Sequence, residues 1–184
     1  KKQYANYTYT PQDNNYFKQA IISRQNKDVV KAIELYKKAI ENNQNVESSI
    51  KDLMSLYLHM LKNASDQTVY DKYFKETKLF TEQYVKKLSK NTNNLSQLEN
   101  FYFALKDYEN FKVIAQLLLE KNIGDKQKCV ILYKMALVAY KEGNKADARH
   151  YLEQASEIDP LNKSVDTLFD LIDNASNTNE NDKK

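Results

Sequence analysis

Apolar side chains recur three and four positions apart from about residue 13 to residue 174. This spacing places them along one side of an α-helix. The chain holds two Gly and two Pro among 184 residues, and sandwiches and barrels need such residues for their turns. The pattern therefore predicts an all-α chain. The scarcity of glycine also excludes the phosphate-binding loops GxGxxG and GxxxxGK[ST].

The helical stripes divide the chain into short segments. After a first helix that begins near Asp13, they span about 28–42, 46–62, 67–89, 95–106, 108–121, 126–141, 145–157 and 163–174. Short polar residues that can accept from free backbone N–H groups precede several stripes. These predicted caps are Asp13, Asn45, Asn94, Asp107, Asp125 and Asn144. Gly124 and Gly143 are placed where a helix end favours a left-handed residue.

The two ends of the chain lack this periodicity. Residues 1–12 are predicted to form an extended leader or linker, and residues 175–184 a disordered tail. No run of about 18 apolar residues is present, so no transmembrane segment is predicted. The chain begins with Lys1 rather than Met, which is compatible with a removed signal peptide or anchor and a cell-envelope role. It is equally compatible with a cytoplasmic protein, so the compartment stays open.

Charge argues against nucleic-acid binding. The chain has 28 Lys and Arg against 25 Asp and Glu, a net charge of +3. Its only arginines are Arg24 and Arg149, although arginine forks are the usual readers of phosphates and guanine edges. Acidic residues alternate with lysines along most of the chain, which is typical of solvated helix faces.

Residues that carry catalytic or metal chemistry are sparse. Cys129 is the single cysteine and adjoins Val130, Ile131 and Leu132, so it is interpreted as a small core or groove residue rather than a nucleophile. One cysteine cannot form an intramolecular disulfide or a zinc cluster. His59 and His150 are the only histidines, and neither belongs to an HExxH motif. A triad assembled in space remains open, but no pattern favours one. The sequence predicts a non-enzyme without metal or cofactor.

Residues 129–162 carry the strongest internal pattern. Leu132, Ala136 and Ala139 fall on its first helix, Gly143 and Asn144 in its turn, and Ala148, Leu152 and Ala155 on its second helix, before Pro160. Small residues at Ala136 and Ala148 allow two helix backbones to approach closely. This segment resembles a tetratricopeptide repeat, a helix pair of 34 residues. Residues 13–46 show the same pattern, whereas units from about 47 and about 92 are divergent.

The resemblance implies a right-handed α-solenoid of antiparallel helix pairs. Its predicted units are 13–46, 47–91, 92–128 and 129–162, followed by a C-terminal capping helix at 163–174, because such arrays require a solvating cap. Four of the 14 tyrosines have core spacing and are predicted to pack between helices with their hydroxyls at the rim: Tyr16, Tyr36, Tyr57 and Tyr102.

In this family, the first helices of successive units line a concave groove that usually binds a peptide or a helix of a protein partner. Carried over residue by residue, the resemblance implies these groove residues: Phe17, Ile21, Arg24, Lys51, Ser55, Leu58, His59, Ser96, Asn100, Phe103, Tyr133, Leu137, Tyr140 and Lys141. The implied function is a non-catalytic scaffold or adaptor for a protein or peptide of unknown identity.

Several alternatives remain at this stage. Some family members grip a C-terminal carboxylate with a clamp of Lys, Asn and Arg, but Phe17 and Ile21 occupy the first clamp positions here, and Asn100 with Lys134 is too little to form one. The groove could instead be partly buried by neighbouring helices or filled by residues 1–12. The chain could also self-associate through the exposed side of the helix at 67–89 or through an uncapped end, as a structural homo-oligomer.

Overall fold

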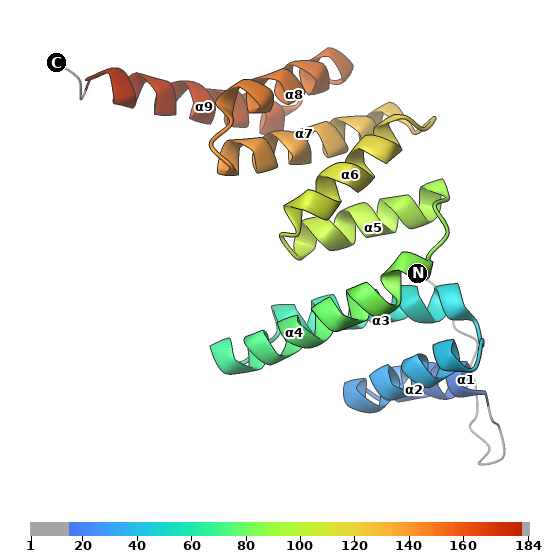
Figure 1. Cartoon of the computed structure of the whole chain (residues 1–184). Helices are drawn as coiled ribbons and strands as arrows, with labels where there is room; N and C mark the ends of the chain where they lie inside the picture. The colour runs from blue at the N-terminus through green and yellow to red at the C-terminus, as the bar shows by residue number, and fades with distance from the viewer. Residues whose placement is uncertain (1–14, 182–184) are drawn as a thin grey trace. The chain divides into compact units, whose positions relative to one another are not determined.

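The computed structural model of the protein describes the backbone of residues 15–181 and the side chains of residues 15–174 (Figure 1). In chain order its elements are α1 Tyr16–Gln25, α2 Val29–Glu41, α3 Val46–Lys62, α4 Gln67–Gln83, the 3-10 turn η1 Val85–Lys87, α5 Thr92–Ala104, α6 Tyr108–Leu119, α7 Asp125–Lys141, α8 Lys145–Ile158 and α9 Lys163–Asn181. These described residues contain no strand, so the predicted all-α class is confirmed. The predicted leader 1–12 and the predicted cap Asp13 lie outside the described residues.

The helices form two compact units, and the boundary along the chain falls between Lys90 and Asn91. We call residues 15–90 the N-terminal unit and residues 91–181 the C-terminal unit. Within each unit, helices pack mainly on their neighbours in sequence, and α9 also contacts α7. Figure 1 shows α7 and α8 as an antiparallel pair. The predicted helical-repeat architecture is therefore confirmed within the units, while its right-handed sense and its division into four repeats stay predictions.

The C-terminal core forms where α7, α8 and α9 meet. Ala136, Ala148 and Ala155 are completely buried, at 0% exposure, which brings the helix backbones close together. From α9, Val165, Leu168 and Ile172 close this core, as do Leu132 and Leu152 from the helix pair. Burying one such large aliphatic side chain stabilises the fold by about 1.5–3 kcal/mol.

The helix caps follow the predicted chemistry only in part. Asp107 and Asn144 accept from the backbone N–H groups of Asn110 and Asp147, as predicted. Asn94 and Asp125 instead lie inside helices, whose caps are Asn91 and Gly124. Asn45 adopts a left-handed conformation without a capping hydrogen bond. Gly124 has φ −67° rather than a left-handed conformation, whereas Gly143 has φ +81° as predicted.

The predicted long helix at 67–89 is wrong at its C-terminal end. The α-helix ends at Gln83, and the 3-10 turn η1 follows it. This tighter turn places Val85 and Leu88 in the core, where they are 2% and 6% exposed. Burial of these two side chains favours the break over continuation of the helix.

The last helix is longer than predicted. It begins at Lys163, as expected, and continues to Asn181 instead of ending near residue 174. The described part of the predicted disordered tail therefore has helical backbone. Residues 182–184 lie outside the described residues.

Tyrosines pack between helices, but the predicted position of their hydroxyls is wrong in two cases. Tyr36 and Tyr57 are completely buried, hydroxyls included. Tyr102 is 7% exposed, and Tyr16 is partly buried. Burial raises the pKa of the Tyr57 hydroxyl, because the charged phenolate would lose its hydration.

Candidate partner-binding surface

The predicted groove residues of the N-terminal unit lie on α1 and α3. Ile21 is only 4% exposed, so it is a packing residue rather than an accessible groove residue. Phe17 is partly buried, with its ring edge on Tyr36 at 5.9 Å between ring centroids. Ser55 and His59 are exposed on α3. Of these predicted groove residues, Ser55 and His59 are accessible to a partner, whereas Ile21 is not.

Arg24 is held by a carboxylate that sequence reasoning missed. Its Nη1 donates to Asp52 Oδ1 at 3.1 Å, and the Asp52 side chain is only 6% exposed. The Tyr36 hydroxyl has its pKa raised by its own burial and then by the negative charge of Asp52. Asp52 lies between the predicted groove residue Lys51 and the buried Leu53. In the sequence, Asp52 is an acidic residue among the apolar residues of this helix, and a buried carboxylate needs a partner. That was the signal from which an ion pair at Asp52 could have been predicted.

The other polar groove candidates of α3 bond mainly within their own helix. Lys51 Nζ lies 4.0 Å from Glu47 Oε2, and Ser55 Oγ donates to the Lys51 carbonyl at 3.2 Å. The His59 ring Nδ1 lies 3.2 Å from the Asn63 side-chain nitrogen. These contacts set side-chain orientation along the helix, and they leave Ser55 and His59 accessible to a partner.

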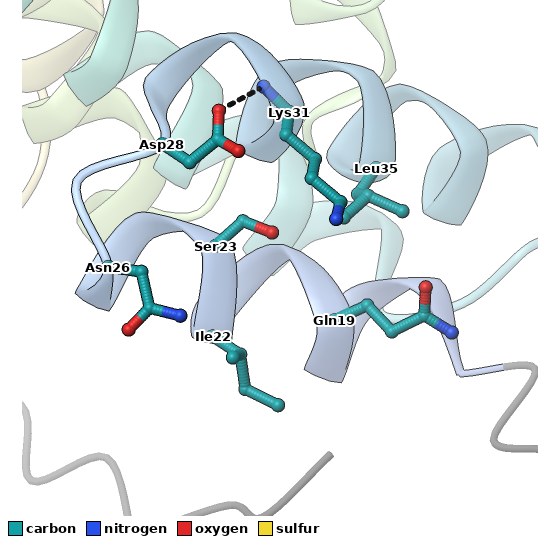
Figure 2. Close-up of a pocket in the computed structure, with 7 residues that line it drawn as sticks. All are labelled: Gln19, Ile22, Ser23, Asn26, Asp28, Lys31 and Leu35. Atoms are coloured by element: carbon teal, nitrogen blue, oxygen red, sulfur yellow. Dashed lines mark hydrogen bonds between the residues drawn. The ribbon is translucent and has the colours of Figure 1, made fainter. Parts of the chain in front are cut away.

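A small pocket lies between α1 and α2, and Figure 2 shows its lining. Its volume is about 260 Å³, and the residues that line it are Gln19, Ile22, Ser23, Asn26, Asp28, Lys31 and Leu35. Asp28 Oδ1 accepts from the backbone N–H of Lys31 at 3.2 Å and so caps α2. None of the predicted groove residues lines this pocket. Its lining combines polar groups with the apolar Ile22 and Leu35, and holds neither histidine nor cysteine.

In the C-terminal unit, Lys134 of α7 is the centre of a polar cluster with α5. Its Nζ donates to Glu99 Oε1 at 3.0 Å and to Asn100 Oδ1 at 2.8 Å. The same ammonium group lies 5.1 Å from the centre of the Phe103 ring. Glu99 is 3% exposed, and its burial raises the pKa of the carboxyl, which Lys134 opposes by lowering it. The positive charge of Lys134 is therefore balanced inside the protein.

Two further contacts join α7 to the preceding helices along the same side. Gln127 Nε2 donates to Ser96 Oγ at 2.7 Å. Lys141 Nζ lies 3.4 Å from the Tyr108 hydroxyl and over its ring. Gln127, Lys134 and Lys141 are seven residues apart, so they lie on one line two helical turns from each other. We call the contacts that Gln127, Lys134 and Lys141 make with α5 and α6 the polar ladder. It includes the predicted groove residues Ser96, Asn100, Phe103 and Lys141.

Beside the polar ladder, α7 carries an apolar stripe. Tyr133, Leu137 and Tyr140 are partly buried and pack against the core of α7, α8 and α9. Val130 continues this stripe by helical spacing and is 46% exposed. The three predicted residues thus lie together on α7, and Val130 was missed although it precedes Tyr133 by three positions.

The remaining residue types that could carry catalytic or metal chemistry do not form a site among the described residues. Cys129 is 3% exposed, and its pKa is raised by burial and then by the charge of Asp159. Its sulfur accepts from Asn162 Nδ2 at 3.4 Å, so the predicted core role is confirmed. Among the described residues, no three His, Cys, Asp or Glu side chains lie together where a metal ion could bind. In that same range no helix is long and apolar enough to span a lipid bilayer.

Comparison with known families supports the repeat. The sequence model of the tetratricopeptide repeat family matches residues 129–162. No curated protein matches the chain. The predicted resemblance is therefore confirmed for the α7–α8 pair, which contains the apolar stripe and one side of the polar ladder. Repeats of this family generally mediate protein–protein interaction.

Proposed function

We propose that the protein is a non-catalytic scaffold that binds an apolar segment or amphipathic helix of a protein partner along α7. The observation that carries this proposal is the apolar stripe of Val130, Tyr133, Leu137 and Tyr140. It keeps part of its surface exposed on the first helix of the repeat that the family model matches. Partner helices typically dock apolar side chains spaced three and four residues apart into such surfaces.

The charges beside the stripe favour an apolar ligand over a C-terminal carboxylate. A carboxylate ligand would need a cation that is available, but the Lys134 ammonium group already contacts Glu99, Asn100 and the Phe103 ring. Separating it from Glu99 would leave a buried carboxylate without its partner, which is costly. Lys141 is exposed and can contribute a single charge at the edge of the surface.

The same proposal extends to predicted positions of the N-terminal unit that are exposed or partly buried. Phe17, Arg24, Lys51, Ser55 and His59 lie on its first and third helices, which are the positions that the family resemblance assigns to ligand binding. We assign Ile21 to packing instead, because its side chain is buried.

The experiment is affinity capture from the native source with three immobilised proteins, read by mass spectrometry. They are the wild type, Val130→Glu on the stripe, and Val113→Glu as the matched control. Val113 is 60% exposed and lies on α6 rather than on α7, so both substitutions place the same charge at an exposed valine. We expect a partner that the wild type and the control capture and that Val130→Glu loses.

Leu137→Glu is a second test with a larger expected effect. Because Leu137 packs against the core of the C-terminal unit, its thermal unfolding must be compared with that of the wild type. Capture that survives both Val130→Glu and a folded Leu137→Glu would overturn the proposed use of α7.

A further inference from the structure

The apolar stripe of α7 begins and ends beside an exposed lysine. Lys126 precedes Val130 by four residues, and Lys141 follows Leu137 by four residues. Side chains four residues apart lie one helical turn from each other on the same side of a helix, so each lysine extends the line of the stripe. We call Lys126, Val130, Leu137 and Lys141 the lysine-ended row. Its two lysines are fifteen positions apart, or about 22 Å along the helix axis.

The lysine-ended row lies on the side of α7 that faces away from the core. At about 100° of rotation per residue, its four members fall within about 60° of one another. Leu132 and Ala139, which join the core with α8 and α9, lie roughly 160° and roughly 180° from Val130. Asp125, the only acidic residue of α7, lies roughly 140° from Val130. The row therefore presents positive charge, and no acidic residue of α7 shares its side.

Neither lysine of the row is neutralised by a neighbouring helix. Within residues 15–174, Lys126 and Lys141 form no ion pair. Lys141 Nζ contacts an uncharged group, the Tyr108 hydroxyl, at 3.4 Å. Glu142 follows Lys141 in the chain, but its carboxylate contacts Lys112 of α6. Both positive charges are therefore available to a ligand on this part of the chain.

The acidic side chains that the structure describes on α9 are also placed elsewhere. Leu168 of α9 is buried in the core that α9 shares with α7. Asp166 and Asp170 each lie two residues from Leu168, which puts them on the opposite side of α9. Asp173 pairs with Arg149 of α8. These carboxylates therefore leave the charge of the lysine-ended row unbalanced.

We propose that the partner helix of α7 carries an acidic side chain at each end of its apolar face. This rests on the function proposed above, because the same stripe holds the partner. Apolar side chains seven residues apart on a partner helix can meet both Val130 and Leu137, which have that spacing. Acidic residues four positions outside them then lie beside Lys126 and Lys141. The row has the same order of residue types from both ends, so a partner helix of either direction fits.

The two lysines select the partner more than they hold it. Exposed ion pairs add little affinity each, whereas like charges in the same places repel a wrong partner. Exposed charges are screened over a Debye length of roughly 30 Å at 0.01 M salt and roughly 8 Å at 0.15 M. The preference for an acidic partner is therefore largest in low salt, while the apolar contact persists in high salt.

The experiment is fluorescence anisotropy with the full chain and two labelled synthetic peptides, at about 20 mM and about 500 mM NaCl. Both peptides are helix-forming, with leucines at positions i, i+3 and i+7 on one side. The acidic peptide has one glutamate four residues before the first leucine and another four residues after the last. The basic peptide is identical except for lysine at those two positions.

Three variants accompany the wild type. Lys126→Glu/Lys141→Glu reverses both charges of the row. Lys72→Glu/Lys75→Glu is the matched control, because it changes the net charge equally at two exposed lysines of α4. Val130→Ser removes apolar surface from the row without adding charge. Circular dichroism checks the helix content of each variant. If the row variant loses helix, Lys126→Glu replaces it and should abolish the preference, because a glutamate in the first turn favours an α-helix.

We expect the wild type and the α4 control to bind the acidic peptide at least about tenfold more tightly than the basic peptide in low salt. Lys126→Glu/Lys141→Glu should prefer the basic peptide instead. The difference between the peptides should shrink in high salt, since screening weakens exposed charge pairs. Val130→Ser should weaken the binding of both peptides by a similar factor, because both use the same apolar contact.

Two results would overturn the proposal. They are a wild type that binds both peptides equally in low salt, and a preference that reversal of the two lysines leaves unchanged. If either occurs while Val130→Ser still weakens both peptides, the stripe binds apolar helices and only the charge selection is wrong. If the wild type binds neither peptide, the proposed binding along α7 fails together with the charge selection. The two failures are therefore distinguishable.

Discussion

The α7–α8 pair and the α3–α4 pair solve the same packing problem with different side chains. In α7–α8, the completely buried Ala136, Ala148 and Ala155 allow close approach of the backbones. In α3–α4, an aromatic ring fills the space instead, because Phe80 lies 5.0 Å from Tyr57 between ring centroids. The family model matches residues 129–162, which contain most of the first pair. The comparison shows that small residues and an aromatic pair can both fill the space between two antiparallel helices.

The largest expected effect is on the aromatic pair. Phe80→Ala should reduce the free energy of unfolding by about 3–5 kcal/mol, because it leaves a cavity at a side chain that is 1% exposed. Chemical unfolding followed by circular dichroism measures this loss. Leu79→Ala, next to it on α4 but 49% exposed, should change stability by less than about 0.5 kcal/mol. Equal losses in the two variants would contradict the role of Phe80.

The α7–α8 pair should lose stability when a buried side chain is made larger rather than smaller, because its core would be overpacked. Ala148→Leu should cost about 1–3 kcal/mol of unfolding free energy, because no space exists for the added methyl groups. Ala146→Leu is the control, since Ala146 is exposed on the same helix. Thermal unfolding of the two variants should differ by several degrees. An Ala148→Leu variant as stable as the wild type would show that α7 and α8 can move apart to accommodate the larger side chain.

The two glycines that flank α7 should respond to substitution in opposite directions. Gly143 has φ +81°, so Gly143→Ser should lose about 1 kcal/mol, although nothing lies within 4 Å of an added Cβ. Gly124 caps α7 with φ −67°, so Gly124→Ser should gain about 0.5 kcal/mol through a better cap. Denaturant midpoints measure both changes. A gain from Gly143→Ser would rule out backbone strain at this turn.

The smallest expected effect concerns pH and the link between α5 and α7. Burial raises the pKa of Glu99 above its ordinary value of 4.5. The folded protein therefore holds this proton more tightly than the unfolded chain, and ionisation of Glu99 lowers stability as pH rises through its folded value. The wild type should lose stability relative to Glu99→Gln between about pH 4 and pH 7. A difference in unfolding free energy that stays constant over this range would contradict the burial of Glu99.

Much of the helical arrangement was predictable because period and turn chemistry are local. The bounds of α2 and α3 agree with the spacing of apolar residues to within one residue. The break after Gln83 was not predictable in this way, since apolar residues continue at helical spacing through Leu88. Only the burial of Val85 and Leu88 in three dimensions favours the turn.

The candidate surface was harder to predict because it depends on pairs from different helices. The stripe residues Tyr133, Leu137 and Tyr140 follow from one helix and were identified. Asp52, which binds Arg24, and Glu99, which binds Lys134, are separated from their partners by 28 and 35 residues. No local sequence pattern relates residues so far apart. In the sequence, Arg24 and Lys134 therefore looked free to bind a ligand, although both are paired in the structure.

The packing of helices on their sequence neighbours also bears on how the chain reaches its structure. When most contacts join segments that are close along the polypeptide, little loop-closure entropy is lost before native contacts form, and folding is fast. Repeat proteins of this kind can begin to fold at one site and propagate from it. The helices of the N-terminal unit find their partners within the first 90 residues, so that unit can fold during synthesis while the remaining helices are still being added.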